Sequence, residues 1–209
     1  MKNTTILSQL PVLLNLASGK PQGTLSASRS LQLALGSLLA SLFLVAIWGA
    51  AAGSHSLQLA AASALKVPLI VLLSTLSAMP VTLLVLKLSG ISYSGRNLFL
   101  SICSGVMGGS LILAALSPIV GVYYHTSVLI GSRLAVLSAF VAIVGSGILI
   151  VRNASRMRTD KTTSKSLALP LGVFVVVALA AMLQFVALAS PVLPNASSFD
   201  AGIDGILQR

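Results

Sequence analysis

The chain alternates between long apolar runs without charge and short polar segments, and this alternation is its clearest feature. One such run lies between Lys66 and Lys87 and is opened by Pro68. A helix of about 20 residues that rises 1.5 Å per residue crosses a hydrocarbon core of roughly 30 Å. The run therefore predicts a transmembrane helix over 67–88.

Four further runs have similar length and polarity. We expect five transmembrane helices, at 31–52, 67–88, 97–120, 133–151 and 167–189. Residues 1–30 are predicted to form an N-terminal interfacial segment and linker, and residues 190–209 a polar C-terminal tail. The runs are continuously apolar and do not alternate residue by residue, so the pattern favours an all-α polytopic membrane bundle over a β-barrel.

Prolines and an aromatic residue refine this picture. Pro68 is predicted to lie near the first turn of the second helix, where its missing N–H costs little, and Pro80 to kink the middle of that helix. The stretch 53–65 is expected to lie along the membrane surface before this helix begins. Trp48 near the end of the first helix is typical of a membrane–water interface.

The uncharged run of the third helix continues as far as Ser132, which is too long for one straight span. Pro118, helped by Gly121, is therefore predicted to end or bend that helix. Residues 122–131 would then form an interfacial connection.

Composition agrees with a membrane protein. Hydrophobic residues make up 56% of the 209 positions and charged residues only 8%, against roughly 25% charged residues in soluble domains. The net charge of +10 lies at span ends and in one loop, so it indicates topology and no nucleic-acid partner.

The basic residues also predict an orientation. With the N-terminus inside, ten of them are inside (Lys2, Lys20, Arg29, Lys87, Arg96, Arg152, Arg156, Arg158, Lys161 and Lys165) and three are outside (Lys66, Arg133 and Arg209). Loops rich in Lys and Arg stay on the cytoplasmic side. We therefore expect the N-terminus inside and the C-terminus outside, in a bacterial inner or internal membrane.

Residues that carry chemistry are scarce. The sequence has no Glu, and its three Asp residues lie in predicted loops or the tail, so no ionisable group is expected at midplane depth. Cys103 is the single cysteine, and His55 and His125 have no nearby carboxylate or cysteine partner. We predict no catalytic residues, no metal site and no cofactor, and the enzyme hypothesis has no positive support.

Small residues recur at the spacing that lets membrane helices approach closely. They form three sets: Gly49 and Gly53; Ser101, Gly105 and Gly109; and Ser138, Ala142 and Ser146. In lipid, close packing of this kind is a main source of helix association. We predict that these residues pack helices together, within one chain or against a partner subunit or a second copy.

One connecting loop is strongly basic. It contains Arg152, Arg156, Arg158, Lys161 and Lys165 against the lone Asp160. Such a segment either only sets the topology or also binds anionic lipid on the cytoplasmic side, or an acidic face of a partner.

The stretch Ala64-Leu65-Lys66-Val67-Pro68-Leu69-Ile70 opens a span that contains Pro80 and is followed by a span rich in Ser and Gly. In this layout, over roughly residues 31–189, the chain resembles bacterial members of the Yip family and related small five-span membrane proteins. The resemblance implies a compact five-helix bundle that acts as a membrane scaffold or in trafficking, without an active site. The chain lacks the long acidic N-terminal region of eukaryotic members and its Asp-Leu-x-Gly-Pro motif, so GTPase binding is not implied.

Three functional hypotheses follow. The first is a non-catalytic membrane scaffold or accessory subunit that packs in a larger membrane assembly. The second is a small-solute permease or channel, suggested by the proline-interrupted spans. The third is a pigment- or lipid-binding membrane subunit, or a lipid-modifying protein, that uses His55 or His125.

Overall fold

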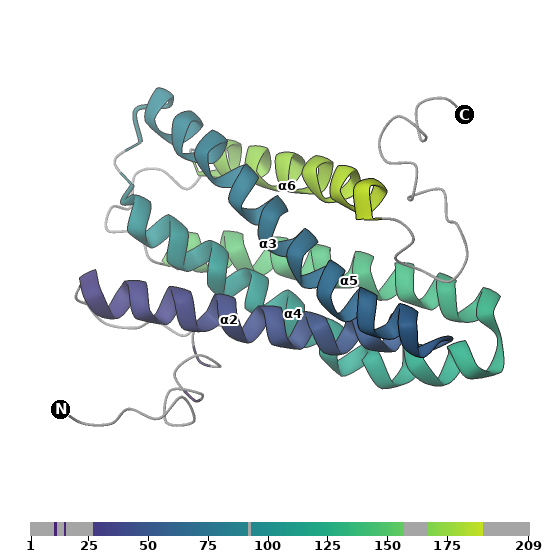
Figure 1. The fold of residues 1–209 in the computed structure, drawn as a ribbon. Helices are drawn as coiled ribbons and strands as arrows, with labels where there is room; N and C mark the ends of the chain where they lie inside the picture. The colour runs from purple at the N-terminus through teal and green to yellow at the C-terminus, as the bar shows by residue number, and fades with distance from the viewer. Residues whose placement is uncertain (1–10, 12–14, 16–26, 92, 157–166, 190–209) are drawn as a thin grey trace, which may run out of the picture.

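The described part of the protein is a bundle of five long helices (Figure 1). The computed structural model describes residues 27–91, 93–156 and 167–189, together with residues 11 and 15. The helices are α2 (Ala27–Ala52), α3 (Leu57–Leu88), α4 (Gly95–Thr126), α5 (Val128–Arg156) and α6 (Ala168–Ala189). All five are long and apolar enough to cross a membrane, which confirms the predicted all-helical class and the number of spans. The predicted N-terminal segment and C-terminal tail lie almost entirely outside the described residues.

The connection between α2 and α3 is shorter than predicted. Ser56 caps α3, because its Oγ accepts a hydrogen bond from the backbone N–H of Leu59 at 3.2 Å. The Ala-rich stretch that follows has a high helix propensity and forms the first turns of α3. The prediction of a surface segment over 53–65 is therefore wrong, and Pro68 lies well inside α3 and not in its first turn.

The predicted end of the third helix at Pro118 is also wrong, whereas the alternative, a bend at Pro118, stays a prediction. α4 continues through Pro118 to Thr126, and only Ser127 separates it from α5. Pro118 cannot donate to the carbonyl of Ala114, but the Ser117 Oγ donates to that carbonyl at 2.8 Å. The helix thus loses one backbone hydrogen bond without leaving the acceptor unpaired. Residues 122–131 are consequently helical, apart from Ser127.

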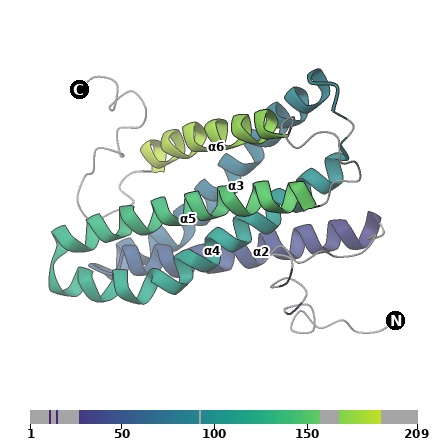
Figure 2. The same cartoon turned by 180° about the vertical axis from the view of Figure 1, so that it is seen from behind.

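The helices lie alongside one another, with α3 crossing the others at an angle (Figures 1 and 2). α2 packs against α3 and α4, while α5 packs along α4 and α6 along α3. α5 and α6 contact each other at few positions. The five helices therefore form a ring in the order α2, α4, α5, α6, α3, and this ring is weakly closed between α5 and α6.

The two ends of the ring are packed differently. At the end where α5 finishes at Arg156, hereafter the Arg156 end, α3, α4, α5 and α6 share an apolar cluster that contains Leu98, Ile150 and Phe174. At the other end, where Arg133 lies near the start of α5, the cluster around Trp48 is formed by α2, α3, α4 and α5, with the last turns of α6 against it. This second end is hereafter the Arg133 end.

Helix length also differs from the prediction. α3 and α4 each have 32 residues, which corresponds to about 48 Å at 1.5 Å per residue and exceeds a hydrocarbon core of roughly 30 Å. Both helices reach beyond the hydrocarbon core. The nine residues of α3 before Lys66 account for much of this excess at the Arg133 end.

Candidate functional site

An apolar cavity of about 410 Å³ lies inside the ring. Side chains from all five helices line it, and α5 and α6 contribute the most. Its residues include Trp48 of α2, Ile70 of α3, Leu113 of α4, Ile143 of α5 and Met182 of α6. The volume falls in the range of roughly 300–1,000 Å³ that is typical of ligand pockets.

The cavity is long and narrow. On α6 its lining runs from Phe174 to Val186, which is about 18 Å along the helix axis at 1.5 Å per residue. A volume of 410 Å³ over this length gives a cross-section of about 23 Å², enough for one hydrocarbon chain whose carbons keep about 4 Å from neighbouring atoms. The length is close to half of a hydrocarbon core of roughly 30 Å, the depth of one leaflet.

The cavity is closed at the Arg156 end and borders the gap in the ring. The apolar cluster around Phe174 closes that end. α5 and α6 come near each other at Gly147, where an added Cβ would lie 4.0 Å from Val175 Cγ2. Val136 and Phe140 of α5 line the cavity, as do Met182 and Val186 in the later half of α6. Because α5 and α6 contact each other at few positions, we call the line between these two sets of residues the α5–α6 opening.

The few polar groups in the lining are already paired within the bundle. The hydroxyls of Ser74, Thr75 and Ser110 donate to carbonyls one turn earlier in their own helices, at 2.6, 2.7 and 2.8 Å. Ser146 Oγ donates across to the Gly105 carbonyl at 3.1 Å. Among the described residues that line the cavity, none is charged. The interior therefore offers dispersion contacts and little hydrogen bonding.

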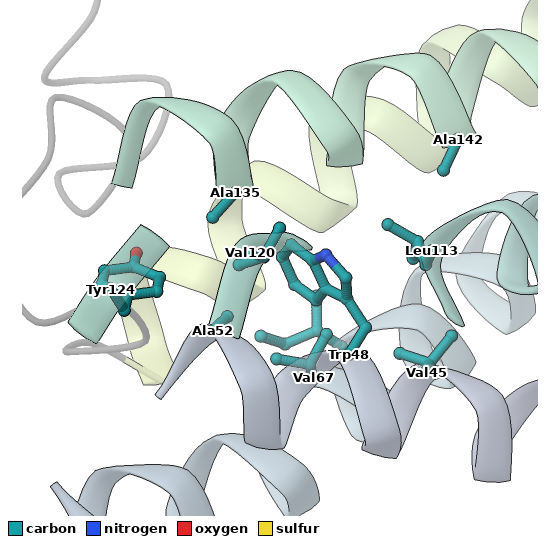
Figure 3. Close-up of a cluster of buried hydrophobic side chains, with 10 residues drawn as sticks. Val45, Trp48, Ala52, Val67, Leu113, Val120, Tyr124, Ala135 and Ala142 are labelled. Carbon is teal, nitrogen blue, oxygen red and sulfur yellow. The ribbon is translucent and has the colours of Figure 1, made fainter. Parts of the chain in front are cut away.

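Trp48 is one of the residues that line the cavity, and Figure 3 shows it within a cluster of buried hydrophobic side chains. Only 6% of its surface is exposed, and its Nε1 donates to Ser138 Oγ at 3.0 Å, which ties α2 to α5. The prediction that Trp48 marks the membrane interface is wrong, because the indole points into the bundle, among Val120, Ala135 and Leu113.

The glycines of the first small-residue set lie between α2 and α3. An added Cβ on Gly49 would lie 2.5 Å from the Ser63 carbonyl oxygen, and one on Gly53 would lie 2.7 Å from Ala60 Cα. These glycines permit the close approach of the two backbones at the Arg133 end.

The second and third sets meet each other between α4 and α5. An added Cβ on Gly109 would lie 2.8 Å from Ser146 Cβ and 2.9 Å from the Ala142 carbonyl oxygen, and one on Gly105 would collide with Ile150. The remaining two members have other roles. Ser101 is buried, with its hydroxyl donating to the Asn97 carbonyl at 2.7 Å, and Ser138 pairs with Trp48.

The interface between α4 and α5 contains one buried polar residue that the sequence analysis did not predict. Asn153 is 1% exposed, and its Nδ2 donates to Ser104 Oγ at 2.8 Å. Its Oδ1 has no hydrogen-bond partner among the described residues. Asn153 follows Arg152 just past the end of the predicted span 133–151. Its position in the sequence therefore gave no sign that it is buried.

Basic residues gather at the Arg156 end. Arg152 and Arg156 are exposed in the last turns of α5, and Lys87 and Arg96 are exposed at the end of α3 and the start of α4. Arg158, Lys161 and Lys165 lie outside the described residues. The predicted role of this loop in binding anionic lipid or a partner stays a prediction, as does the kink at Pro80.

The two histidines do not form a metal site with other described residues. His55 is exposed in the turn before α3, and His125 is exposed in the last turn of α4. Across residues 27–91, 93–156 and 167–189, no three His, Cys, Asp or Glu side chains come together.

Five candidate membrane-spanning helices around an apolar cavity define a helical integral membrane protein. Comparisons with protein-family models, curated proteins and solved structures give no match. The resemblance to the Yip family therefore stays a prediction.

Proposed function

We propose that this protein is a non-catalytic membrane subunit that binds the hydrocarbon chain of a lipid in the cavity of its five-helix ring. The observation that carries the proposal is the cavity itself, with its volume of 410 Å³, its length of about one leaflet and its apolar lining. Among the three hypotheses drawn from the sequence, lipid binding is the one that this geometry favours.

Dispersion contacts support occupancy by a lipid chain. The lining is almost entirely apolar, and lipid chains surround a ring that spans a membrane. A chain that enters along the α5–α6 opening gains dispersion contacts with this lining.

The same lining disfavours a polar solute. A permease for ions or sugars needs groups that replace water around the solute, and the hydroxyls in this cavity already donate to backbone carbonyls. An apolar molecule requires no such replacement.

The scaffold hypothesis has less specific support. Gly49, Gly53, Gly105 and Gly109, which suggested a partner interface, all face neighbouring helices of the same chain. The predicted orientation, with the N-terminus inside, and the location in a bacterial inner membrane are retained as part of the proposal. They are supported by five described basic residues at the Arg156 end: Arg29, Lys87, Arg96, Arg152 and Arg156.

Trp48 provides a direct test, because it is the only tryptophan of the chain and lines the cavity. The protein is reconstituted in nanodiscs with increasing fractions of a phosphatidylcholine whose chains carry bromine, which quenches tryptophan fluorescence on contact. Since Trp48 is buried from the surrounding bilayer, we expect quenching only if a chain enters the cavity.

Two variants make the test specific. Ala178→Phe fills the cavity from α6 and should abolish quenching, whereas Ala115→Phe places the same side chain on the exposed face of α4 and should leave it unchanged. Absence of quenching in the unmodified protein, or equal quenching in both variants, would refute the proposal.

A further inference from the structure

An exposed positive charge lies near the Arg133 end of the cavity, where Lys66, half-buried on α3, is a second basic residue. Arg133 is exposed on α5, three residues before Val136 and seven before Phe140, which both line the cavity. Residues spaced by three and seven lie on one side of a helix. Arg133 is therefore about 4.5 Å along the helix axis beyond Val136, on the side of α5 that borders the α5–α6 opening.

The direction of the side chain fits this position. Helical side chains lean toward the N-terminus of their helix, and α5 begins at the Arg133 end. The guanidinium of Arg133 can accordingly extend away from the cavity toward the polar surface of the membrane. A chain in the cavity with its polar end at the opening would bring its headgroup to this guanidinium.

Arg133 has no anionic partner in the described part of the chain. It forms no hydrogen bond or ion pair with another described residue. The whole sequence has only three acidic residues, and all three, Asp160, Asp200 and Asp204, lie outside the described residues. An anionic headgroup is chemically complementary to this exposed guanidinium.

We propose that the cavity and Arg133 together form a site for an anionic phospholipid, with one hydrocarbon chain inside the ring and the phosphate of the headgroup on Arg133. This inference rests on the proposed function and adds the class of lipid to it. The cavity is closed by apolar side chains at the Arg156 end, so the chain enters tail first and the headgroup stays at the Arg133 end. The planar guanidinium can donate two hydrogen bonds to one phosphate.

The test compares two brominated lipids with identical chains, phosphatidylglycerol and phosphatidylcholine, in the Trp48 quenching assay. One basic residue near a membrane surface favours an anionic lipid by about fivefold. We expect half-maximal quenching at a mole fraction of phosphatidylglycerol about fivefold lower than that of phosphatidylcholine.

Substitutions at Arg133 separate this inference from the proposed function. Arg133→Gln should remove the preference while quenching by both lipids persists, and Arg133→Lys should retain part of the preference. Arg96→Gln is the matched control, because Arg96 is an exposed arginine at the Arg156 end, at the start of α4. A preference that survives Arg133→Gln would overturn the assignment, whereas no quenching by either lipid would refute lipid binding itself.

Two further variants complete the design. The pair Phe43→Trp and Trp48→Phe moves the fluorophore to the exposed face of α2, where both lipids should quench equally because it reports on the surrounding bilayer. Asp200→Asn with Asp204→Asn removes the tail carboxylates. If the unmodified chain shows no preference and this double variant gains one, Arg133 is occupied by an internal carboxylate and the proposal is wrong.

Discussion

Replacing Gly109 by Ala tests whether the α4–α5 interface depends on a glycine. The added Cβ would lie 2.8 Å from Ser146 Cβ and 2.9 Å from the Ala142 carbonyl oxygen, whereas carbon atoms in contact keep about 3.5–4.0 Å apart. Both neighbours belong to, or lie beside, the backbone of α5, so they cannot rotate away. The two helices must separate by about 1 Å, and over-packing of this kind costs typically 1–3 kcal/mol.

Two other glycines provide graded controls for the same substitution. Gly145→Ala meets only the terminal Cδ1 of Ile112, at 2.6 Å, which is the flexible end of a side chain. Gly172→Ala meets nothing within 4 Å on α6 and gains helix propensity of about 1 kcal/mol. Because all three changes share that gain, differences among them isolate the packing cost.

The assay is unfolding of the detergent-solubilised protein, followed by Trp48 fluorescence and circular dichroism. We expect stability to decrease in the order Gly172→Ala, Gly145→Ala, Gly109→Ala, with about 1–3 kcal/mol between the first and the last. Equal stability of the Gly109 and Gly172 variants would refute the close-packing explanation. Loss of assembly with a partner, without loss of chain stability, would show that Gly109 faces another protein.

Three further predictions concern single polar contacts. Asn153→Ala removes the hydrogen bond to Ser104 and should destabilise the bundle by about 0.6–1.7 kcal/mol in the same unfolding assay. Unchanged stability would show that the cost of the unpaired Oδ1 offsets the hydrogen bond. Ser117→Ala should destabilise α4 by roughly 1 kcal/mol, because the Ala114 carbonyl loses its donor, and amide hydrogen exchange should increase around this turn. Burial raises the pKa of Tyr93 above its usual value of 10.0, and a hydrogen bond with Ser101 opposes the shift in part. The neutral phenol therefore stabilises the fold fully below pH 10.0 and less as the pH rises above it. Because phenylalanine cannot ionise, Tyr93→Phe should reduce the loss of stability at alkaline pH. An unchanged pH profile of stability in this variant would contradict the prediction.

The apolar runs were sufficient to predict the number and class of the helices, but not their ends. The ends depend on local contacts that a hydropathy pattern does not contain. Ser56 starts α3 well before the charged boundary at Lys66, and the Ser117 hydroxyl lets α4 continue past Pro118. In both cases the predicted helix was shorter than the observed one, because a side-chain hydrogen bond allows the helix to extend further.

The cavity could not be predicted, because it depends on which helices are neighbours. α6 has exposed or half-buried apolar residues on every side beyond its first turns, so its sequence shows no preferred face. It packs along α3 and not along α5, its neighbour in sequence. The burial of Trp48 follows from the same arrangement, since the indole reaches Ser138 only when α2 lies across from α5.

The pairing of α6 with α3 has a consequence for biosynthesis. Since α6 is translated after α2, α3, α4 and α5, the first four helices can assemble around a trough before its last wall exists. A lipid molecule already lying in that trough would be enclosed when α6 inserts, without passing between finished helices. Co-expression of two fragments divided between Arg156 and Ala168 would show whether late addition of α6 yields the same lipid content as uninterrupted synthesis.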